Sequence, residues 1–326
     1  MTPTTTALDA SELVDHPSGF LALSARNQRF TVSDVPGFIA YREQGRHLIA
    51  FGGVHAAPSS QPELLDRFLE HAASGRRGVV VVQLREPQVP LFLARGFTVN
   101  KLGTSFGLTL RHYSLAGSQK MQLRNKISRA RKAGLRVVEV GRDLPRDERT
   151  FAQLHAISAE WLKGKGKNEL EFMIGELADP ADSRRRIFMA VDPRDQAVAF
   201  ITYVPAWGAR FGYLHDLTRR RPSAPPGTME LINAHAIEQM MAEGVEYLHF
   251  GFTPFIVDGD EHTGASRLVA WTVRKLQRYG RLIYPADSQA RYKLKWGPDI
   301  REPEYIAARP LSIRSLIDLL RITRSI

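Results

Sequence analysis

The sequence predicts a mixed α/β protein with two domains. The chain has 326 residues, 43% of them hydrophobic, which is enough for two ordinary domains with separate cores. Short runs rich in β-branched and aromatic residues alternate with segments whose apolar residues recur at helical spacing. Strands that follow one another, with helices crossing back between them, predict a mixed sheet covered by helices on both faces, once in each half of the chain.

The first predicted domain spans residues 19–117 and follows a poorly ordered leader at residues 1–18. Its clearest elements are a helix at Pro62–Ala73, whose leucines share one side, and a buried strand at Gly78–Gln83, which is an almost unbroken apolar run. The other expected elements are a hairpin of Phe38–Tyr41 with His47–Phe51, a short helix near Pro87–Arg95, and edge-like strands from Gly96–Val99 to Leu108–Leu110.

The second predicted domain, residues 118–310, begins with a basic helix and repeats this alternation. The further elements are a strand at Leu135–Val140, a helix at Asp147–Leu162, strands near Ile187–Val191, Ala197–Val204 and Arg210–Leu214, a helix from Thr228, and a strand at Glu246–Phe250. This order is compatible with a GNAT-type acetyltransferase fold. However, Arg219–Gly227 is rich in proline and lacks the Gly-rich loop that holds a pyrophosphate, so we do not expect acetyl-CoA as the donor.

The composition excludes several kinds of chemistry and location. The chain has no cysteine, so it forms neither a disulfide nor a thiolate metal site, and its ten histidines show no HExxH spacing. We therefore expect no metal site. The N-terminus lacks the apolar core of a signal peptide, and no segment approaches the ~20 consecutive apolar residues of a membrane-spanning helix. We expect a cytoplasmic protein.

The basic charge indicates a polyanionic partner. The net charge is +11 and the pI is near 10.0, which favours RNA, DNA or an anionic membrane surface. Residues 119–136 contain no acidic residue, and a helical stripe of Leu123, Ile127, Ala130 and Gly134 would face the protein. A helix that is merely solvated would normally use i,i+4 ion pairs, so polyanion binding is favoured over that alternative. The basic residues here are Lys120, Arg124, Lys126, Arg129, Arg131, Lys132 and Arg136.

Three further basic segments leave their alternatives open. Lys163, Lys165 and Lys167 alternate with glycines and predict a second basic loop. Residues 289–298 alternate with period two, with Arg291, Lys293 and Lys295 on one side and Tyr292, Leu294 and Trp296 on the other. That pattern fits a phosphate-lined cleft or a guarded edge strand equally well. The amphipathic basic helix at 311–326 could lie on anionic lipid or pack on its own domain.

The most informative stretch runs from His215 to Ile237. Asp216 is expected at the C-terminal end of a strand, and Pro222–Gly227 forbids regular structure after it. Thr228 is a candidate cap for the helix that follows. Strand, rigid loop and helix N-terminus together predict an anion site. The alternative is a structural ion pair between Asp216 and a neighbouring arginine.

Several landmarks now coincide in one order. They are Lys120–Gly134 (KMQLRNKISRARKAG), Glu160-Trp161-Leu162, Asp216-Leu217-Thr218-Arg219, Pro222-x-Ala224-Pro225-x-Gly227-x-Met229-Glu230, Gly251-Phe252-Thr253-Pro254 and Lys293-x-Lys295-Trp296-x-Pro298. From about Phe20 to Pro310 the chain resembles the catalytic region of the aminoacyl-phosphatidylglycerol synthases, the multiple peptide resistance factors, which transfer Lys or Ala from charged tRNA to a membrane lipid. The resemblance implies a tandem GNAT-type fold, with aminoacyl-tRNA and the acceptor entering a tunnel between the domains from opposite sides.

Two departures from this family concern the acceptor. The lipid enzymes usually carry a long multi-helix membrane region ahead of this part, and none is expected here. Residues 298–305 lack the Trp that the family tends to place between its two prolines, and are one residue longer. Both features resemble the relatives in which aminoacyl-tRNA supplies an amino acid to a small hydroxyl- or hydroxylamine-bearing metabolite.

The resemblance implies an aminoacyltransferase that uses aminoacyl-tRNA as co-substrate and no bound cofactor. Its partners would be aminoacyl-tRNA, a metabolite or phosphatidylglycerol as acceptor, and peripherally an anionic membrane, with no DNA. The competing hypothesis is a non-catalytic RNA- or membrane-binding protein of the same fold. The basic residues expected to bind tRNA are Lys120, Arg124, Lys126, Arg129, Arg131, Lys132, Lys163, Lys165 and Lys295.

Each catalytic demand then has a candidate residue. Asp216 would hold the α-ammonium group or accept the proton of the nucleophile, and Arg219 would orient Asp216 or bind a phosphate. Glu230 is a second carboxylate, although it could simply favour a helix N-terminus. His215 would be a further proton carrier or a core histidine, and Lys293 would neutralise a phosphate.

Overall fold

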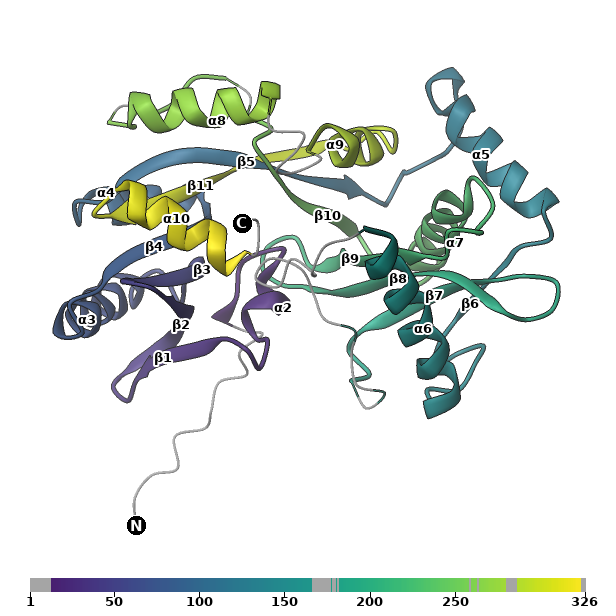
Figure 1. The fold of residues 1–326 in the computed structure, drawn as a ribbon, viewed down its shortest axis with the longest axis horizontal. Helices are drawn as coiled ribbons and strands as arrows, with labels where there is room; N and C mark the ends of the chain where they lie inside the picture. Colours follow the sequence, from purple (N-terminus) through teal and green to yellow (C-terminus); the bar gives the residue numbers. More distant parts are fainter. Residues whose placement is uncertain are drawn as a thin grey trace, which may run out of the picture.

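The structure is a computed structural model that describes residues 13–165, 177, 180, 182–257, 259–262, 264–279 and 286–323. Within these residues a single sheet of eleven strands runs through the molecule, in the order β1-β2-β3-β4-β11-β5-β10-β9-β8-β7-β6 (Figure 1). The strands are β1 (Gln28–Val32), β2 (Val35–Gln44), β3 (His47–His55), β4 (Gly78–Arg85), β5 (Thr98–Thr109), β6 (Arg136–Glu139), β7 (Arg186–Val191), β8 (Ala197–Ala206), β9 (Gly212–Arg220), β10 (Tyr247–Pro254) and β11 (Ile300–Arg309).

Helices cover both faces of this sheet (Figure 1). In the first half, α3 buries leucines and Phe68 on one face, and α10 packs on the other through Ile322. In the second half, α5 and α7 share a core on one face, while α6 packs on the other. The helices are α2 (Gly19–Ala22), α3 (Gln61–Ser74), α4 (Val89–Leu93), α5 (Met121–Lys132), α6 (Glu148–Lys165), α7 (Thr228–Ala242), α8 (Arg267–Tyr279), α9 (Ala286–Leu294) and α10 (Ile313–Ile322), with 3-10 turns at Glu86–Gln88 and Ser118–Lys120.

The two halves repeat one motif and exchange their last strands. β2 and β3 are antiparallel, α3 follows, and β4 returns parallel to β3. In the same way β8 and β9 are antiparallel, α7 follows, and β10 returns parallel to β9. β5 from the first half then pairs with β10, β11 from the second half pairs with β4, and β5 and β11 pair with each other. The halves therefore share one sheet instead of forming the two expected sheets.

The exchange corrects the prediction for residues 96–110. Instead of two edge-like strands, the chain forms the single twelve-residue strand β5, which lies between β11 and β10 in the middle of the sheet. Its sequence contains Asn100, Lys101 and Thr104, which are typical of an edge. These polar groups are paired inside the protein: Asn100 exchanges hydrogen bonds with the backbone of Ser266, and the Thr104 hydroxyl donates to the carbonyl of Ile256.

Helix ends and the first residues also differ from expectation. α6 extends to Lys165, so Lys163 lies in a helix rather than a loop, while Lys167 lies outside the described residues. The first residue of α7 is Thr228, and Gly227, with φ +91°, occupies the cap position. Residues 13–18, expected within the leader, pack on the sheet, with Val14 and His16 buried.

The C-terminal helix α10 packs on its own sheet. Of the two alternatives for this helix, lying on anionic lipid or packing on its own domain, the structure has the second. Leu316, Leu319 and Ile322 contribute to the core beneath it. On the same helix, Asp318 accepts hydrogen bonds from the ring Nδ1 of His47 at 2.7 Å and from the backbone N–H of Arg46 at 3.2 Å. In the part of the chain that the structure describes, no helix is long and apolar enough to cross a membrane.

Candidate active site

A cavity of about 370 Å³ lies where the two halves of the sheet meet. Residues of the N-terminal segment, β4, α6, β9, β10, α9 and the end of α10 all contribute to its wall, so distant parts of the sequence converge here. The lining residues that carry polar side chains or rings include Ser18, Gln83, Trp161, His215, Asp216, Thr218, Arg219, Phe250, Phe252, Gln289, Tyr292, Lys293 and Thr323. Four of the five predicted catalytic residues are therefore brought together: His215, Asp216, Arg219 and Lys293.

A β-bulge explains how adjacent residues of β9 reach one cavity. The pairing of β8 with β9 shifts between Ile201 and Tyr203, which lie opposite Thr218 and His215 respectively. Side chains normally alternate between the two faces of a strand, and a bulge re-aims them. Asp216 is consequently inside a strand that continues to Arg220, and not at a strand end as its sequence context indicates.

Asp216 is held by a cation that the sequence pattern does not single out. Its carboxylate forms an ion pair with the guanidinium of Arg185, and both side chains are buried. The hydroxyl of Thr202 lies 3.4 Å from the same carboxylate oxygen and accepts the backbone N–H of Leu217 at 3.0 Å. Arg185 thus fixes the carboxylate on the cavity wall. The only sequence signal for it is the run Arg184-Arg185-Arg186, which resembles any solvated basic stretch.

The guanidinium group of Arg219 lies over an aromatic ring. Its guanidinium carbon is 4.2 Å from the ring centroid of Trp161 on α6, and its Nη1 donates to the carbonyl of Thr218 at 3.1 Å. A guanidinium over an aromatic face gains a cation–π attraction, which restricts where its charge lies. The sequence motif contained Trp161, but sequence reasoning assigned it no role.

His215 is surrounded by rings. The ring centroids of Tyr203, Phe250 and Tyr292 lie 5.5, 5.8 and 5.9 Å from the imidazole. Burial, and then the positive charge of Lys293, lower the pKa of His215 to about 3, so the imidazole is neutral near pH 7. Its Nε2 has no hydrogen-bond partner among the described residues, although it is buried on the cavity wall. A bound molecule could supply that partner.

Lys293 reaches the cavity from the last turn of α9. This segment was expected to be extended, but it forms a helix that buries Lys293 and partly buries Tyr292. The Nζ of Lys293 donates to the carbonyls of Gly251 at 2.8 Å and Phe252 at 2.9 Å. Burial lowers the pKa of Lys293 to about 7, although the charge of Glu304 opposes the shift.

Glu230 lies outside the cavity lining and is engaged with two cations. Its Oε1 is 2.7 Å from the Nζ of Lys295 and 3.4 Å from the Nζ of Lys126. Burial acts to raise the pKa of Glu230, but the charges of Lys295 and Lys126 outweigh it and the net shift is downward. Lys295 also lies over the ring of Tyr292, 3.8 Å from its centroid.

The predicted tRNA-binding residues divide into two sets. Lys120 and Arg124 are bound to backbone carbonyls of the preceding segment: Lys120 donates to the carbonyl of Ser114 at 2.8 Å, and Arg124 donates to the carbonyls of Leu115 and Gly117 at 2.6 Å. On the outer side of α5 and at the end of α6 the side chains are exposed, and the side chain of Lys165 lies outside the described residues. The exposed residues of this second set are Lys126, Arg129, Arg131, Lys132 and Lys163, and Lys126 also pairs with Glu230.

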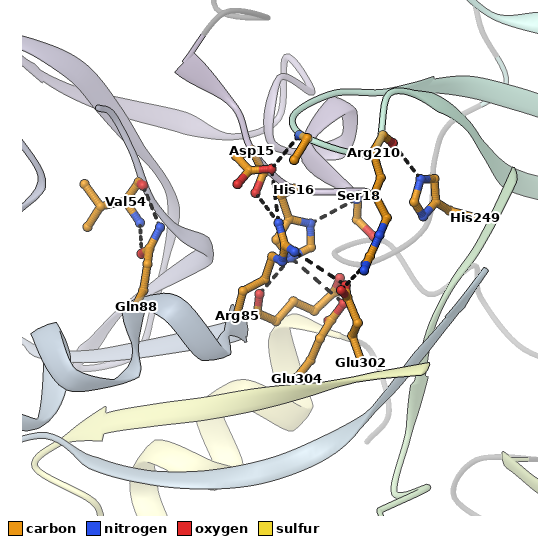
Figure 2. Close-up of polar contacts among 12 residues, drawn as sticks. Asp15, His16, Ser18, Val54, Arg85, Gln88, Arg210, His249, Glu302 and Glu304 are labelled. Carbon is orange, nitrogen blue, oxygen red and sulfur yellow. Dashed lines mark hydrogen bonds and ion pairs between the residues drawn. The ribbon is translucent and has the colours of Figure 1, made fainter. Parts of the chain in front are cut away.

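Behind the cavity lies a buried polar cluster that sequence reasoning missed. His16 donates through Nε2 to the carbonyl of Gln83 at 2.9 Å and accepts at Nδ1 from the backbone N–H of Ser18 (Figure 2). Glu304 accepts a hydrogen bond from the hydroxyl of Ser105, and its Oε1 is 4.0 Å from Nε2 of His16. Burial raises the pKa of Glu304 to about 7, against the hydrogen bond from Ser105. No motif marks these residues, because they come from the expected leader and from β11.

A second cavity of about 310 Å³ adjoins this cluster. Figure 2 shows Arg85 and Arg210 converging on Glu302, and Arg85 also reaching Asp15 at 3.2 Å. The positive charges of the arginines that line this cavity are thus balanced by carboxylates on the same wall. Neither here nor elsewhere in the described parts of the chain do three His, Asp or Glu side chains gather as metal ligands would.

A mixed sheet built from two repeats, with a cavity of titratable groups at the seam between them, confirms the predicted α/β class. The chain matches the family model "Phosphatidylglycerol lysyltransferase, C-terminal" over residues 8–308. The chain therefore belongs to that family.

Individual relatives agree with this assignment. The chain is 26% identical over 294 residues to the lysylphosphatidylglycerol biosynthesis bifunctional protein LysX of Mycobacterium bovis (strain BCG). The matched region covers 87% of the chain and 24% of that protein. It is 29% identical over 268 residues to the LysX protein of Mycolicibacterium vanbaalenii, covering 80% of the chain and 24% of the relative. The chain thus spans about a quarter of the length of these two proteins.

Two solved structures share the fold. The structure of L-PGS from Bacillus licheniformis superposes with a TM-score of 0.79 at 20% identity, covering 96% of this chain and 93% of that one. The C-terminal domain of a putative lysylphosphatidylglycerol synthetase from Agrobacterium fabrum gives a TM-score of 0.78 at 20% identity, with the same coverage.

Proposed function

We propose that the protein transfers an aminoacyl group from aminoacyl-tRNA to a hydroxyl group, with phosphatidylglycerol as the first candidate acceptor. The observation that carries the proposal is the convergence of His215, Asp216, Arg219 and Lys293 on one cavity of about 370 Å³. Family membership supports an aminoacyl group as the transferred unit, and the names of the relatives support a lipid acceptor. A purely binding protein would have no need of these four groups in one cavity.

The reaction requires an acceptor oxygen that loses its proton as it attacks the ester carbonyl. A general base works best when its pKa is near the operating pH, which favours Lys293, with a pKa of about 7, over His215, with a pKa of about 3. A neutral lysine amine can donate both N–H groups to the carbonyls of Gly251 and Phe252 and still present its lone pair.

In the proposed step, the acceptor oxygen bonds to the carbonyl carbon while its proton passes to Nζ of Lys293. The tetrahedral intermediate then collapses, the bond to the 3′ oxygen of the tRNA breaks, and Lys293 returns the proton to that oxygen. Asp216, fixed by Arg185, would hold the α-ammonium group, and Arg219 would bind a phosphate of the tRNA terminus. His215 would orient the acceptor hydroxyl by accepting its hydrogen bond during approach.

The exposed cations of α5 support tRNA as the source of the aminoacyl group. Arg129, Arg131 and Lys132 make no ion pair within the described residues. They lie on α5, and the other side of this helix packs in the core. A row of uncompensated cations is what a phosphate backbone requires. The proposal needs no bound cofactor or metal, because aminoacyl-tRNA is an activated ester.

The test is incubation of the whole chain with a mixture of radiolabelled aminoacyl-tRNAs and phosphatidylglycerol vesicles, followed by separation of lipid-soluble and water-soluble products. Label in the lipid phase is expected. Label in a water-soluble product other than free amino acid would assign a small metabolite as the acceptor. Label that leaves tRNA no faster than in the enzyme-free reaction would overturn the proposal. The Lys293→Met variant is the matched control.

A further inference from the structure

Helix α8 presents two large apolar side chains to solvent. Val269, Ala270 and Val273 are buried on its inner side. On its outer side Leu268 is 71% exposed and Trp271 is 56% exposed. Figure 1 shows α8 as an outer layer beside β5, against which it packs. Single exposed apolar residues are common, but a Trp and a Leu that share one helix face form a patch that needs a partner.

The same face is cationic. Arg267, Arg274 and Lys275 are exposed, and at 100° per residue they fall with Leu268 and Trp271 into one arc of about 120°. The Nζ of Lys275 lies 5.5 Å from the ring centroid of Trp271. The sequence of α8 contains no acidic residue, so every charged side chain that this helix itself contributes is positive.

This face differs from that of α10, the helix that the sequence pattern made the candidate for lipid. The apolar side of α10 is covered by its own sheet, and the helix carries the buried Asp318. In α8 the inner side is covered and a second, separate apolar patch remains outside. Exposure therefore distinguishes two helices that have the same amphipathic character in sequence.

We propose that the outer face of α8 docks on an anionic phospholipid bilayer. A bilayer interface takes up Trp and Leu side chains at the level of the headgroups and attracts the surrounding cations when its lipids are anionic, which matches both properties of this patch. The net charge of +11 adds attraction of the same sign.

Docking through α8 would bring the cavity to the lipid. Along the chain, α8 follows β10, which ends at Pro254, and precedes α9, which carries Tyr292 and Lys293. Both neighbouring elements line the cavity. The inference deepens the proposed function by naming how a lipid acceptor is reached. It rests on the α8 patch, and its primary readout is binding to vesicles, which requires neither aminoacyl-tRNA nor turnover.

The experiment is flotation of the whole chain with vesicles of phosphatidylcholine alone or mixed with phosphatidylglycerol. The unmodified protein is expected to float with the anionic vesicles only. The double variant L268S/W271S should lose at least tenfold in vesicle affinity, whereas I313S, which changes a side chain on α10 that is 78% exposed, should bind as the unmodified protein does. All three side chains are exposed, so folding should be retained, which circular dichroism verifies.

Three results would overturn the inference. They are equal binding by L268S/W271S and the unmodified protein, equal binding to neutral and anionic vesicles, and loss of tRNA affinity in L268S/W271S with vesicle binding intact, which would make the patch a nucleic-acid surface. Transfer to phosphatidylglycerol in detergent micelles should survive in L268S/W271S. That assay separates failure of docking from failure of the proposed reaction.

Discussion

The carboxylate of Asp216 on β9 forms a buried ion pair with the guanidinium of Arg185, which lies 31 residues earlier and directly precedes β7. An arginine next to an aspartate in the sequence is the usual candidate for such a pair. Here the sheet brings the partner across β8, and the bulge opposite Thr202 sets the direction of the carboxylate. The position of the Asp216 carboxylate in the cavity therefore depends on how the strands of the sheet pack.

Replacing Asp216 by Asn should therefore reduce both stability and activity. The variant leaves Arg185 as a buried charge without its carboxylate, which costs about 3–5 kcal/mol of unfolding free energy. Transfer should fall roughly 100-fold, because the α-ammonium group loses a charged partner. Urea unfolding and single-turnover transfer measure the two effects.

The double variant R185Q/D216N separates the two roles. Removal of both charges should restore much of the lost stability, since no buried ion remains, while transfer stays low. If the double variant regained activity along with stability, Asp216 would act only through the fold.

The pH dependence of transfer should follow Lys293. The neutral amine is the active form of a general base, so kcat/KM should rise as the pH rises through about 7 and then level off. Glu304→Gln removes a negative charge that raises the pKa of Lys293, so the rise should move to lower pH in this variant. Initial rates across the pH range, corrected for spontaneous ester hydrolysis, provide the measurement.

A profile that falls with increasing pH would contradict this assignment. It would mean that Lys293 acts as an ammonium ion, neutralising a phosphate or the carbonyl oxygen. Glu304→Gln would then move the fall to lower pH, and Lys293→Arg, which keeps the charge at all accessible pH values, should remove it.

Glu230 should contribute less than Asp216. Its carboxylate is outside the cavity lining and bound by Lys295 and Lys126, and partly exposed ion pairs are worth at most about 1 kcal/mol. Glu230→Gln should lower kcat/KM by less than about fivefold. A loss as large as that of D216N would place Glu230 in the reaction.

The outer cations of α5 should carry tRNA affinity. Replacing Arg129, Arg131 and Lys132 by Gln should weaken tRNA binding and reduce the slope of log Kd against log salt concentration by roughly 0.7–0.9 per lost phosphate contact. The side chains are exposed, so the fold should not change. Filter binding at several salt concentrations gives both quantities.

A matched control is the triple replacement of Arg29, Arg46 and Arg67 by Gln, at the β1 end of the sheet. It removes the same formal charge from exposed positions. An equal loss in both triples would show that net charge, and not α5, determines the affinity.

Local sequence patterns correctly predicted the elements whose burial follows from one apolar run or one apolar stripe. The unbroken apolar run of β4 and the apolar stripes of α3 and α5 gave the correct element types, and Leu123, Ile127 and Ala130 are buried as expected. The motif around Asp216 also identified three residues that line one cavity, namely His215, Asp216 and Arg219. In these cases neighbours in sequence determine the environment.

Predictions failed where partners came from far away in the chain. Alternation in residues 289–298 indicated a strand, but the consecutive residues Tyr292 and Lys293 are partly buried and buried respectively, because the helix α9 lies against β10. Sequence patterns did not identify Arg185 and Glu304 for the same reason, because the sheet brings their partners to them from distant parts of the chain. Burial of a charged group depends on tertiary contacts, which no local period records.

The exchanged strands also limit how this protein can move. To part the two halves, the ladders of β5 with β10 and of β11 with β4 would both have to break, so the cavity cannot open by rotation of hinged bodies. Substrates must pass through its mouths, and only the side chains and short segments at the rim can gate their entry. The rate of substrate exchange should therefore respond to substitutions of lining residues outside the sheet, such as Gln289 on α9, far more than to changes in the central strands.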